Sequence, residues 1–278
     1  MNFPRFWKAA QTGKVTTWGW SNTSVEEAMA KARERQARVL EWLKGAKRFD
    51  ELGRYGYPDR PMREEVLREF PDARGARAGV LTRNSYGCTV LNTTNLVFVD
   101  VDTPRGSVGS FLGRLLGRKS PDPQTALEQA LAAKARSWIS ARPDWRWRLY
   151  RTAAGARLIA VHRPLPPGDP QVQQAFEHFG ADRLYRALCK TQQCFRARLT
   201  PKPWRCETDR PPYNWPWPNA EAERHFREWE REYTTKTTPY ATCRFLEEFG
   251  TAPIAREFED MLQTHDRTTR AHEVLSLA

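Results

Sequence analysis

Long apolar runs and cysteines are scarce in this sequence, and each scarcity excludes a class of protein. No stretch approaches the roughly 18 uncharged apolar residues that a transmembrane helix needs. Residues 1–8 contain no apolar signal-peptide core, so we expect no secretory signal. Five cysteines are too few, and odd in number, for the disulfide framework of a secreted protein. We therefore expect a cytoplasmic protein that does not enter a membrane.

The common cofactor motifs are also missing. The sequence contains neither a Walker phosphate loop nor the glycine fingerprint of dinucleotide-binding folds. Cys189, Cys194 and Cys206 are spaced like no common zinc knuckle, so we expect buried thiols there. A single His265 and Asp266 pair in a helical stretch does not by itself indicate a phosphohydrolase. Any functional site must therefore come from other residue patterns.

Positive charge is what the sequence has in excess. Its 45 Lys and Arg against 33 Asp and Glu leave a net charge of +12. An excess of this size favours polyanionic partners, nucleic acid first and an anionic membrane surface second. The alternative is a solubility charge spread over the whole surface. Nothing in the sequence fixes the oligomeric state.

Turn residues and apolar periodicity predict a group of strands in the middle of the chain. Strands are expected at residues 78–82, 87–91, 96–102, 147–152 and 157–163, with an extended segment at 194–202. Helices are expected from a capping box at Ser24 and Glu27 to Gly45, and at residues 62–70, 123–139, 171–179, 182–189 and most of the chain from 219. The first three strands form a meander in this prediction, and residues 106–120 a connection. The mixture predicts an α+β fold with a mainly antiparallel central sheet covered by helices.

The strands and helices suggest three parts along the chain. Residues 76–218 are expected to form the α+β core that carries any site. Residues 1–75 are expected to form an N-terminal helical flank, and residues 219–278 a C-terminal helical flank. With 40% hydrophobic residues in a chain of 278, we expect the three parts to pack as one globular unit.

The apolar strand at residues 96–102 ends in two acids. Side chains alternate across a strand, and the face that helices can bury carries Val97, Val99 and Val101. The opposite face carries Leu96, Phe98, Asp100 and Asp102. Two adjacent carboxylates repel each other, and a divalent cation such as Mg²⁺ or Mn²⁺ removes that repulsion. The pattern predicts metal ligation by Asp100 and Asp102; the alternative is that the acids point into water or meet arginines.

Two further segments carry groups suited to phosphate. A small-residue turn at 153–156 separates Thr152 from a strand that ends in His162, which brings a hydroxyl and an imidazole towards one site. Taken alone, such a histidine is more often a plain core or surface residue. An extended segment at 195–202 would carry on one side Arg196, Arg198, Thr200 and Lys202. Such a row suits phosphate binding, and the alternative is an exposed basic edge strand.

In this order the motifs resemble those of the archaeo-eukaryotic primase superfamily, which includes primase-polymerases. In that family a strand ending in D-x-D supplies two metal-binding carboxylates, matched here by Asp100 and Asp102. A Ser or Thr, a glycine and a phosphate-contacting His follow, similar here to Thr152, Gly155 and His162. A later strand holds the nucleotide with basic and hydroxyl groups. The similar positions here, with Arg157 added, are Arg196, Arg198, Thr200 and Lys202.

The resemblance implies an RRM-like or primase-like core and metal-dependent nucleotidyl transfer. Asp100, Asp102 and His162 would be catalytic, with Mg²⁺ or Mn²⁺ as cofactor and with nucleotides and a nucleic-acid template as partners. The family's third acid has no match on a later strand of this sequence. Two alternatives stay open: a non-catalytic nucleic-acid- or nucleotide-binding protein that uses the same sheet face, and a metal-dependent nuclease or phosphoesterase.

Overall fold

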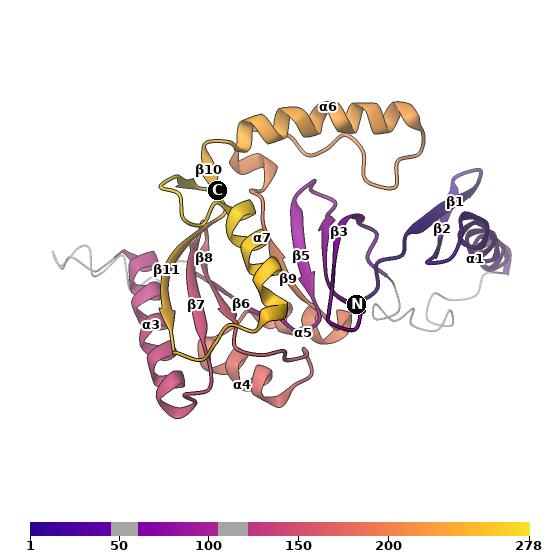
Figure 1. Cartoon of the computed structure of the whole chain (residues 1–278). Helices are drawn as coiled ribbons and strands as arrows, with labels where there is room; N and C mark the ends of the chain where they lie inside the picture. Colours follow the sequence, from indigo (N-terminus) through magenta and orange to yellow (C-terminus); the bar gives the residue numbers. More distant parts are fainter. Residues whose placement is uncertain (46–60, 105–121) are drawn as a thin grey trace.

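The computed structural model describes residues 1–45, 61–104 and 122–278 (Figure 1). The predicted α+β class is confirmed, because the described residues form six helices and twelve strands in largely antiparallel sheets. None of the described helices is both long and apolar enough to cross a membrane. The predicted connection at residues 106–120 lies outside the described residues.

One four-stranded sheet carries the predicted acid pair. Its strands lie in the order β11 (Cys243–Phe249), β7 (Trp147–Thr152), β8 (Gly155–Ala160) and β6 (Val97–Asp102), each antiparallel to its neighbour. Helix α3 (Pro123–Ala141) connects β6 to β7, and α4 (Pro170–Phe179) and α5 (Arg183–Gln192) follow β8. Strand β9 (Phe195–Arg198) follows these helices and contacts β6. The chain order is β6-α3-β7-β8-α4-α5-β9, which is a βαββαβ order with one added helix, as expected for the RRM-like core that the resemblance implies.

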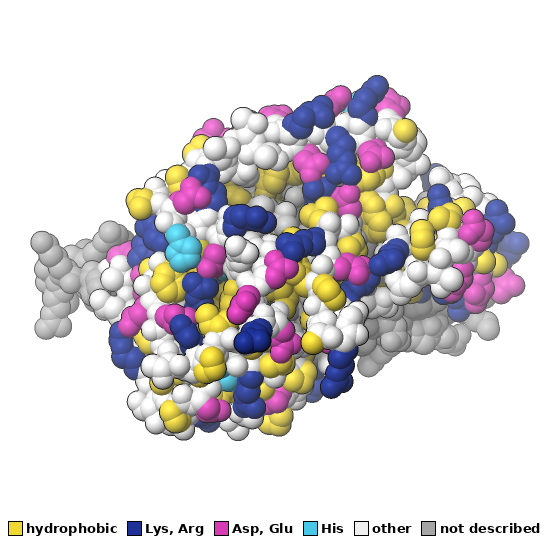
Figure 2. Space-filling view, in the orientation of Figure 1, with side chains coloured by type: hydrophobic (Ala, Val, Ile, Leu, Met, Phe, Trp, Pro, Cys, Tyr) yellow, Lys and Arg dark blue, Asp and Glu magenta, His cyan; other side chains and the backbone are white. Residues whose placement is uncertain are grey.

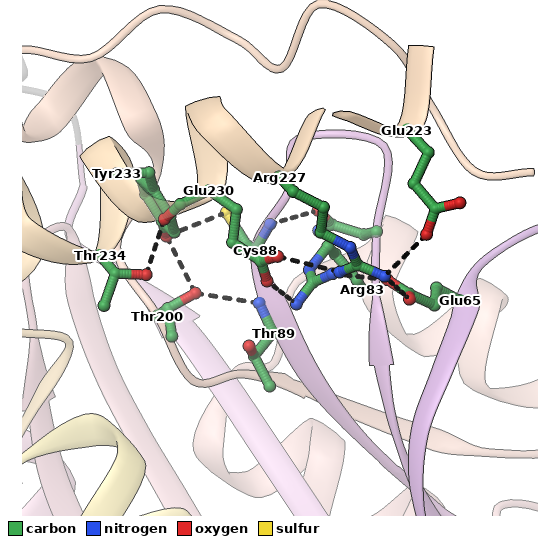
Figure 3. Close-up of polar contacts among 11 residues, drawn as sticks. Glu65, Arg83, Cys88, Thr89, Thr200, Glu223, Arg227, Glu230, Tyr233 and Thr234 are labelled. Carbon is green, nitrogen blue, oxygen red and sulfur yellow. Dashed lines mark hydrogen bonds and ion pairs between the residues drawn. The ribbon is translucent and has the colours of Figure 1, made fainter. Parts of the chain in front are cut away.

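A second sheet meets the first where β9 lies beside β6. Its strands lie in the order β3 (Glu65–Pro71), β4 (Arg77–Arg83), β5 (Thr89–Thr93) and β9. The long helix α6 (Ala220–Thr237) crosses the ends of these strands, as Figures 1 and 3 show. Tyr233 on α6 donates a hydrogen bond to Pro201 O at 2.5 Å, and Arg227 pairs with Glu65 at 2.9 Å. The first contact holds the segment that follows β9, and the second holds α6 to β3.

The valine face of β6 is buried beneath helices, as predicted. Val97 and Val99 are fully buried and Val101 is 7% exposed. Together with Trp138 of α3 and Phe179 of α4 they belong to the main hydrophobic core. Full burial of such a side chain stabilises the fold by about 1.5 to 3 kcal/mol. Helix α7 (Glu259–Thr269) covers the opposite face of the sheet (Figure 1).

Several sequence predictions for the flanks are wrong. Residues 62–70 do not form the predicted helix. The residues of this segment favour a helix, but it pairs with β4 and forms strand β3 instead. The N-terminal flank also contains a hairpin of β1 (Phe6–Thr12) and β2 (Val15–Ser21), which packs on α1 (Val25–Gly45). The C-terminal flank supplies strand β11 and a short parallel pair, β10 (Tyr240–Ala241) and β12 (Ser276–Leu277). The division of the chain into three parts stays a prediction.

The predicted meander is right for two strands and wrong for the third. Strands β4 and β5 pair as expected, but β5 takes β9 as its other neighbour. Strand β6 instead pairs with β8, so that Asp100 lies opposite Arg157 and Asp102 opposite Gly155. This exchange of partners decides which side chains surround the two acids.

Candidate functional site

The carboxylate of Asp100 is held by an arginine. Arg157 donates from Nε to Asp100 Oδ1 at 2.7 Å and from Nη2 to Oδ2 at 3.0 Å. The side chain of Arg157 is 5% exposed and that of Asp100 is 35% exposed. Burial opposes the charge of Arg157, but the adjacent carboxylate of Asp100 raises the pKa of this guanidinium above its usual value. For Asp100 the structure therefore shows the alternative stated above, in which the acid pairs with an arginine.

Arg157 also joins the two sheets to α7. Its remaining Nη1 donates to the backbone oxygen of Arg198 on β9 at 3.2 Å, and lies 3.4 Å from Nε2 of His265 on α7. It further lies 3.8 Å from Cys243 Sγ of β11. A buried guanidinium satisfied in this way stabilises one arrangement of the surrounding elements.

His265 and Asp266 continue this hydrogen-bonded chain away from Arg157. The His265 ring stacks on Phe98 with centroids 6.1 Å apart, and its Nδ1 lies 2.9 Å from Asp266 Oδ1. Burial lowers the pKa of His265, so the neutral ring donates from Nδ1 and accepts from Arg157 at Nε2. Asp266 also accepts from Tyr150 Oη and from Arg148 Nη1, both at 2.9 Å. Because Arg157, His265 and Asp266 each have hydrogen-bond partners within the protein, we interpret these contacts as a structural network.

The sequence pattern did not reveal this network, although a signal was present. Met261, Leu262 and His265 recur at helical spacing, and all three are buried in the structure. A histidine on an apolar helix face indicates a buried imidazole that needs polar partners. Its partners are on strands more than a hundred residues earlier, so they cannot be identified from the local pattern.

The predicted metal site is not formed by the residues as they lie. Over residues 1–45, 61–104 and 122–278, no three His, Cys, Asp or Glu side chains are placed to hold a metal ion together. Both oxygens of Asp100 accept hydrogen bonds from Arg157, and Asp102 is exposed at the end of β6. This donor set does not fit Mg²⁺ or Mn²⁺, which prefer several free oxygen ligands.

His162 does not join the acids. It follows β8 at the end far from Gly155, the residue paired with Asp102. Its ring lies 4.3 Å from that of Trp145, within the tryptophan group beside α3. The side chain is 8% exposed, and burial, with the charge of Arg163, lowers its pKa to about 4. The structure therefore supports the plain core reading for this histidine.

Thr152 and Gly155 lie together at the end of the sheet that carries Asp102. Thr152 pairs in register with Gly155, and Gly155 with Asp102. A Cβ added at Gly155 would come within 2.1 Å of the backbone oxygen of Val101. Close approach of the two strands is therefore a sufficient reason for glycine at this position.

The alternation predicted for residues 195–202 is confirmed. The inward residues Phe195, Ala197 and Leu199 are fully buried. The outward ones have separate partners. Arg196 pairs with Glu64 at 2.6 Å, whereas Thr200 Oγ1 accepts from Thr89 N at 2.9 Å and lies as close to Tyr233 Oη. These two side chains are occupied by the fold.

The remaining cations of this segment form what we call the cationic cluster: Arg198, Lys202 and Arg205. In the described part of the chain none of the three forms an ion pair, and Arg198 donates only to Thr200 O, at 3.0 Å. Burial lowers the pKa of Arg198, and so do the charges of Arg157 and Arg205. Burial lowers the pKa of Lys202 too, with Arg198 and Arg205 acting in the same direction and Asp102 in the opposite one. The three cations repel one another, and the single exposed acid beside them leaves an excess of positive charge. Such an excess favours the binding of an anion.

Of the predicted residues, the structure groups five around the junction of β6, β8 and β9. These are Asp100, Asp102, Arg157, Arg198 and Lys202. Arg205 completes the group and was missed, because its proline-rich surroundings show no periodicity. No protein-family model, no curated protein and no solved structure matches the chain.

Proposed function

We propose that the protein binds nucleic acid and that the cationic cluster Arg198, Lys202 and Arg205 holds its phosphates. The observation that carries the proposal is that none of these three cations forms an ion pair among the described residues, although Asp102 lies near Lys202. Other poorly exposed arginines, such as Arg83 and Arg196, lie against carboxylates. Charge left uncompensated inside a folded surface is typical of a site for an anionic ligand.

Phosphate suits this site for chemical reasons. A guanidinium donates two parallel hydrogen bonds to phosphate oxygens, and an ammonium adds a compact charge. Burial, and after it repulsion between the cations, lowers the pKa of Arg198 and Lys202, and a bound anion would relieve that repulsion. Net charge alone does not mark the site, because basic and acidic side chains are interspersed over the face shown in Figure 2. The local grouping is the stronger argument.

Binding of a labelled oligonucleotide, followed by fluorescence anisotropy between about 50 and 200 mM salt, tests the proposal. The double variant Lys202→Gln, Arg205→Gln is expected to weaken binding and to reduce the slope of log K against log salt by about 0.9 for each lost phosphate contact. Lys14→Gln, which removes an exposed cation from the β1–β2 turn, is the matched control and leaves both unchanged. An identical slope for the double variant and the control refutes the proposal.

Nucleotidyl transfer is a second candidate function, favoured by one observation. Asp102 is exposed and its charge raises the pKa of Lys202, against the larger effect of burial, so a carboxylate lies beside the cationic cluster. No metal-dependent step is assigned, since the described acids do not form a metal site. Incorporation of a labelled nucleotide on a single-stranded template tests this candidate. The informative variant is Asp102→Asn, because a change at Asp100 also removes the partner of Arg157.

A further inference from the structure

An exposed aromatic group lies directly beside the cationic cluster. Trp204 belongs to the short helix η3 (Pro203–Arg205) and is 47% exposed, whereas Trp138, Trp145 and Trp147 are at most 2% exposed. Indole surface in water gains nothing for the fold, since it buries no apolar area. An exposed aromatic side chain of this size next to unpaired cations therefore indicates a ligand with its own flat apolar face.

Two cations and a second ring surround Trp204. Tyr86 and the indole form a T-shaped pair, with ring centroids 5.2 Å apart and ring planes at 89°. Lys202 Nζ lies 5.5 Å from the indole centroid, and Arg210 lies 5.4 Å from it and 5.1 Å from the centroid of Tyr86. We call Tyr86, Lys202, Trp204 and Arg210 the aromatic platform. Lys202 belongs to both groups, so the platform adjoins the cationic cluster.

The backbone holds the platform in place. Arg205 N donates to Lys202 O at 2.9 Å, and the buried Pro203 anchors the turn that presents Trp204. On the other side, Asn84 Oδ1 accepts from Tyr86 N at 2.9 Å and fixes the β4–β5 turn. Because the backbone of both turns is held in this way, less conformational entropy is lost when a ligand binds, which favours affinity.

From this geometry we infer that the ligand is single-stranded nucleic acid, with a base stacked on Trp204 and the adjoining phosphates held by Lys202, Arg210 and the cationic cluster. The inference rests on the proposed function and specifies its substrate class. In a duplex the base faces are covered by neighbouring base pairs, so only an unpaired base can present its face to the indole. Stacking depends on the ring face, which all bases have, so the platform is expected to accept many sequences.

Three DNA probes separate the contribution of the base from that of the phosphate: a thymidine 12-mer, an abasic 12-mer with the same phosphates, and a 12-base-pair duplex. The full-length protein is expected to bind the thymidine strand most tightly. Trp204→Ala is expected to weaken binding of this strand about 10- to 100-fold and to leave the abasic strand unchanged. Trp204→Phe retains a ring and is expected to restore most of the affinity.

Tyr213→Ala is the matched control. Tyr213 is an exposed aromatic residue at 39%, and it stacks on His225 of α6 instead of the platform. This variant is expected to bind all three probes as the parent protein does. Because Trp204 is exposed, Trp204→Ala is expected to keep the parent's thermal unfolding midpoint, which the same preparations can confirm.

The outcomes distinguish failure of this inference from failure of the proposed function. Salt-dependent binding of all three probes with equal affinity, unaffected by Trp204→Ala, overturns the single-strand inference and leaves phosphate binding in place. Tighter binding of the duplex than of the thymidine strand would also overturn the single-strand inference and leave phosphate binding in place. Failure to bind any probe at about 50 mM salt overturns both proposals. A loss with Trp204→Ala that equals the loss with Tyr213→Ala also refutes a specific platform.

Discussion

Asp100 and Arg157 face each other on neighbouring strands, and two hydrogen bonds of 2.7 and 3.0 Å join the carboxylate to the guanidinium. The arginine of this pair is the more buried partner. Asp100 therefore has a structural role, because its charge compensates that of the buried Arg157. Loss of activity on changing Asp100 would therefore not identify it as a catalytic group.

The first prediction concerns the stability that this pair provides. Asp100→Asn removes the charge that compensates Arg157 and is expected to lower the free energy of unfolding by about 3 to 5 kcal/mol. Asp102→Asn, two residues along the same strand face but exposed, is the control and is expected to change it by less than about 0.5 kcal/mol. Urea unfolding of both variants checks the prediction. Equal stabilities would show that Arg157 does not depend on Asp100.

The second prediction concerns Gly155. Gly155→Ala places a methyl group 2.1 Å from the backbone oxygen of Val101, so the β8 and β6 strands must move apart. We expect a loss of at least about 1 to 3 kcal/mol, the usual range for overpacking a close contact. Gly168→Ala meets no atom within 4 Å and serves as the control. Thermal unfolding compares the two, and a Gly155 variant as stable as the control would restore a functional explanation for this glycine.

The third prediction is a pH dependence of stability. The native state holds His162 neutral with its pKa lowered to about 4, whereas the unfolded chain binds a proton near pH 6.5. As the pH falls from 6.5 towards 4, only the unfolded state gains this proton, so stability decreases with falling pH. At about 1.4 kcal/mol for each pKa unit, the decrease reaches roughly 3 kcal/mol.

A comparison with His162→Gln isolates this effect, because glutamine does not titrate. Urea unfolding at pH 7 and at pH 4.5 is expected to show a smaller loss for the variant than for the parent protein. Buried His265, whose pKa is also lowered, contributes a decrease of the same sign to both proteins. Equal losses in parent and variant would mean that His162 is not held neutral.

The fourth prediction concerns added metal. Since Arg157 occupies both oxygens of Asp100, about 5 mM Mg²⁺ or Mn²⁺ is expected to leave the unfolding midpoint unchanged at constant ionic strength. A site with a dissociation constant near 0.1 mM would instead stabilise the protein by about 2.3 kcal/mol at that concentration. Saturable stabilisation that Asp102→Asn abolishes would revive the metal site predicted from the sequence.

Local patterns predicted those features that depend on local geometry. The alternation of Val97, Val99 and Val101, and that of residues 195–199, follows from the twofold repeat of a strand. The helix predicted at 62–70 failed because pairing with β4 outweighs the helical preference of that segment. Strand neighbours are also set by long-range packing, so nothing near Asp100 in the sequence revealed that Arg157 would lie opposite.

For the candidate site, too, the sequence predicted the local pattern but not the long-range partners. The basic row was identified, but which of its members are free depends on Glu64 and Tyr233, which lie far away in the sequence. Among the described residues Arg198 and Lys202 form no ion pair, whereas Arg196 pairs with Glu64 and Thr200 is hydrogen-bonded to Thr89 and Tyr233. Trp204 and Arg210 were missed because an aromatic residue in a proline-rich segment gives no sign of its exposure.

The contacts of Arg157 have a consequence for how the chain folds. Its guanidinium joins groups that are 41, 57 and 108 residues away along the chain. Contacts of such long sequence separation cost loop-closure entropy before they stabilise the fold, and they slow folding. During synthesis, Asp100 and Arg157 can pair well before α7 leaves the ribosome, but Phe98 lacks His265 as its cover until then. We expect the completion of this face by α7 to be a slow step of folding, during which the nascent chain exposes an apolar surface that invites aggregation.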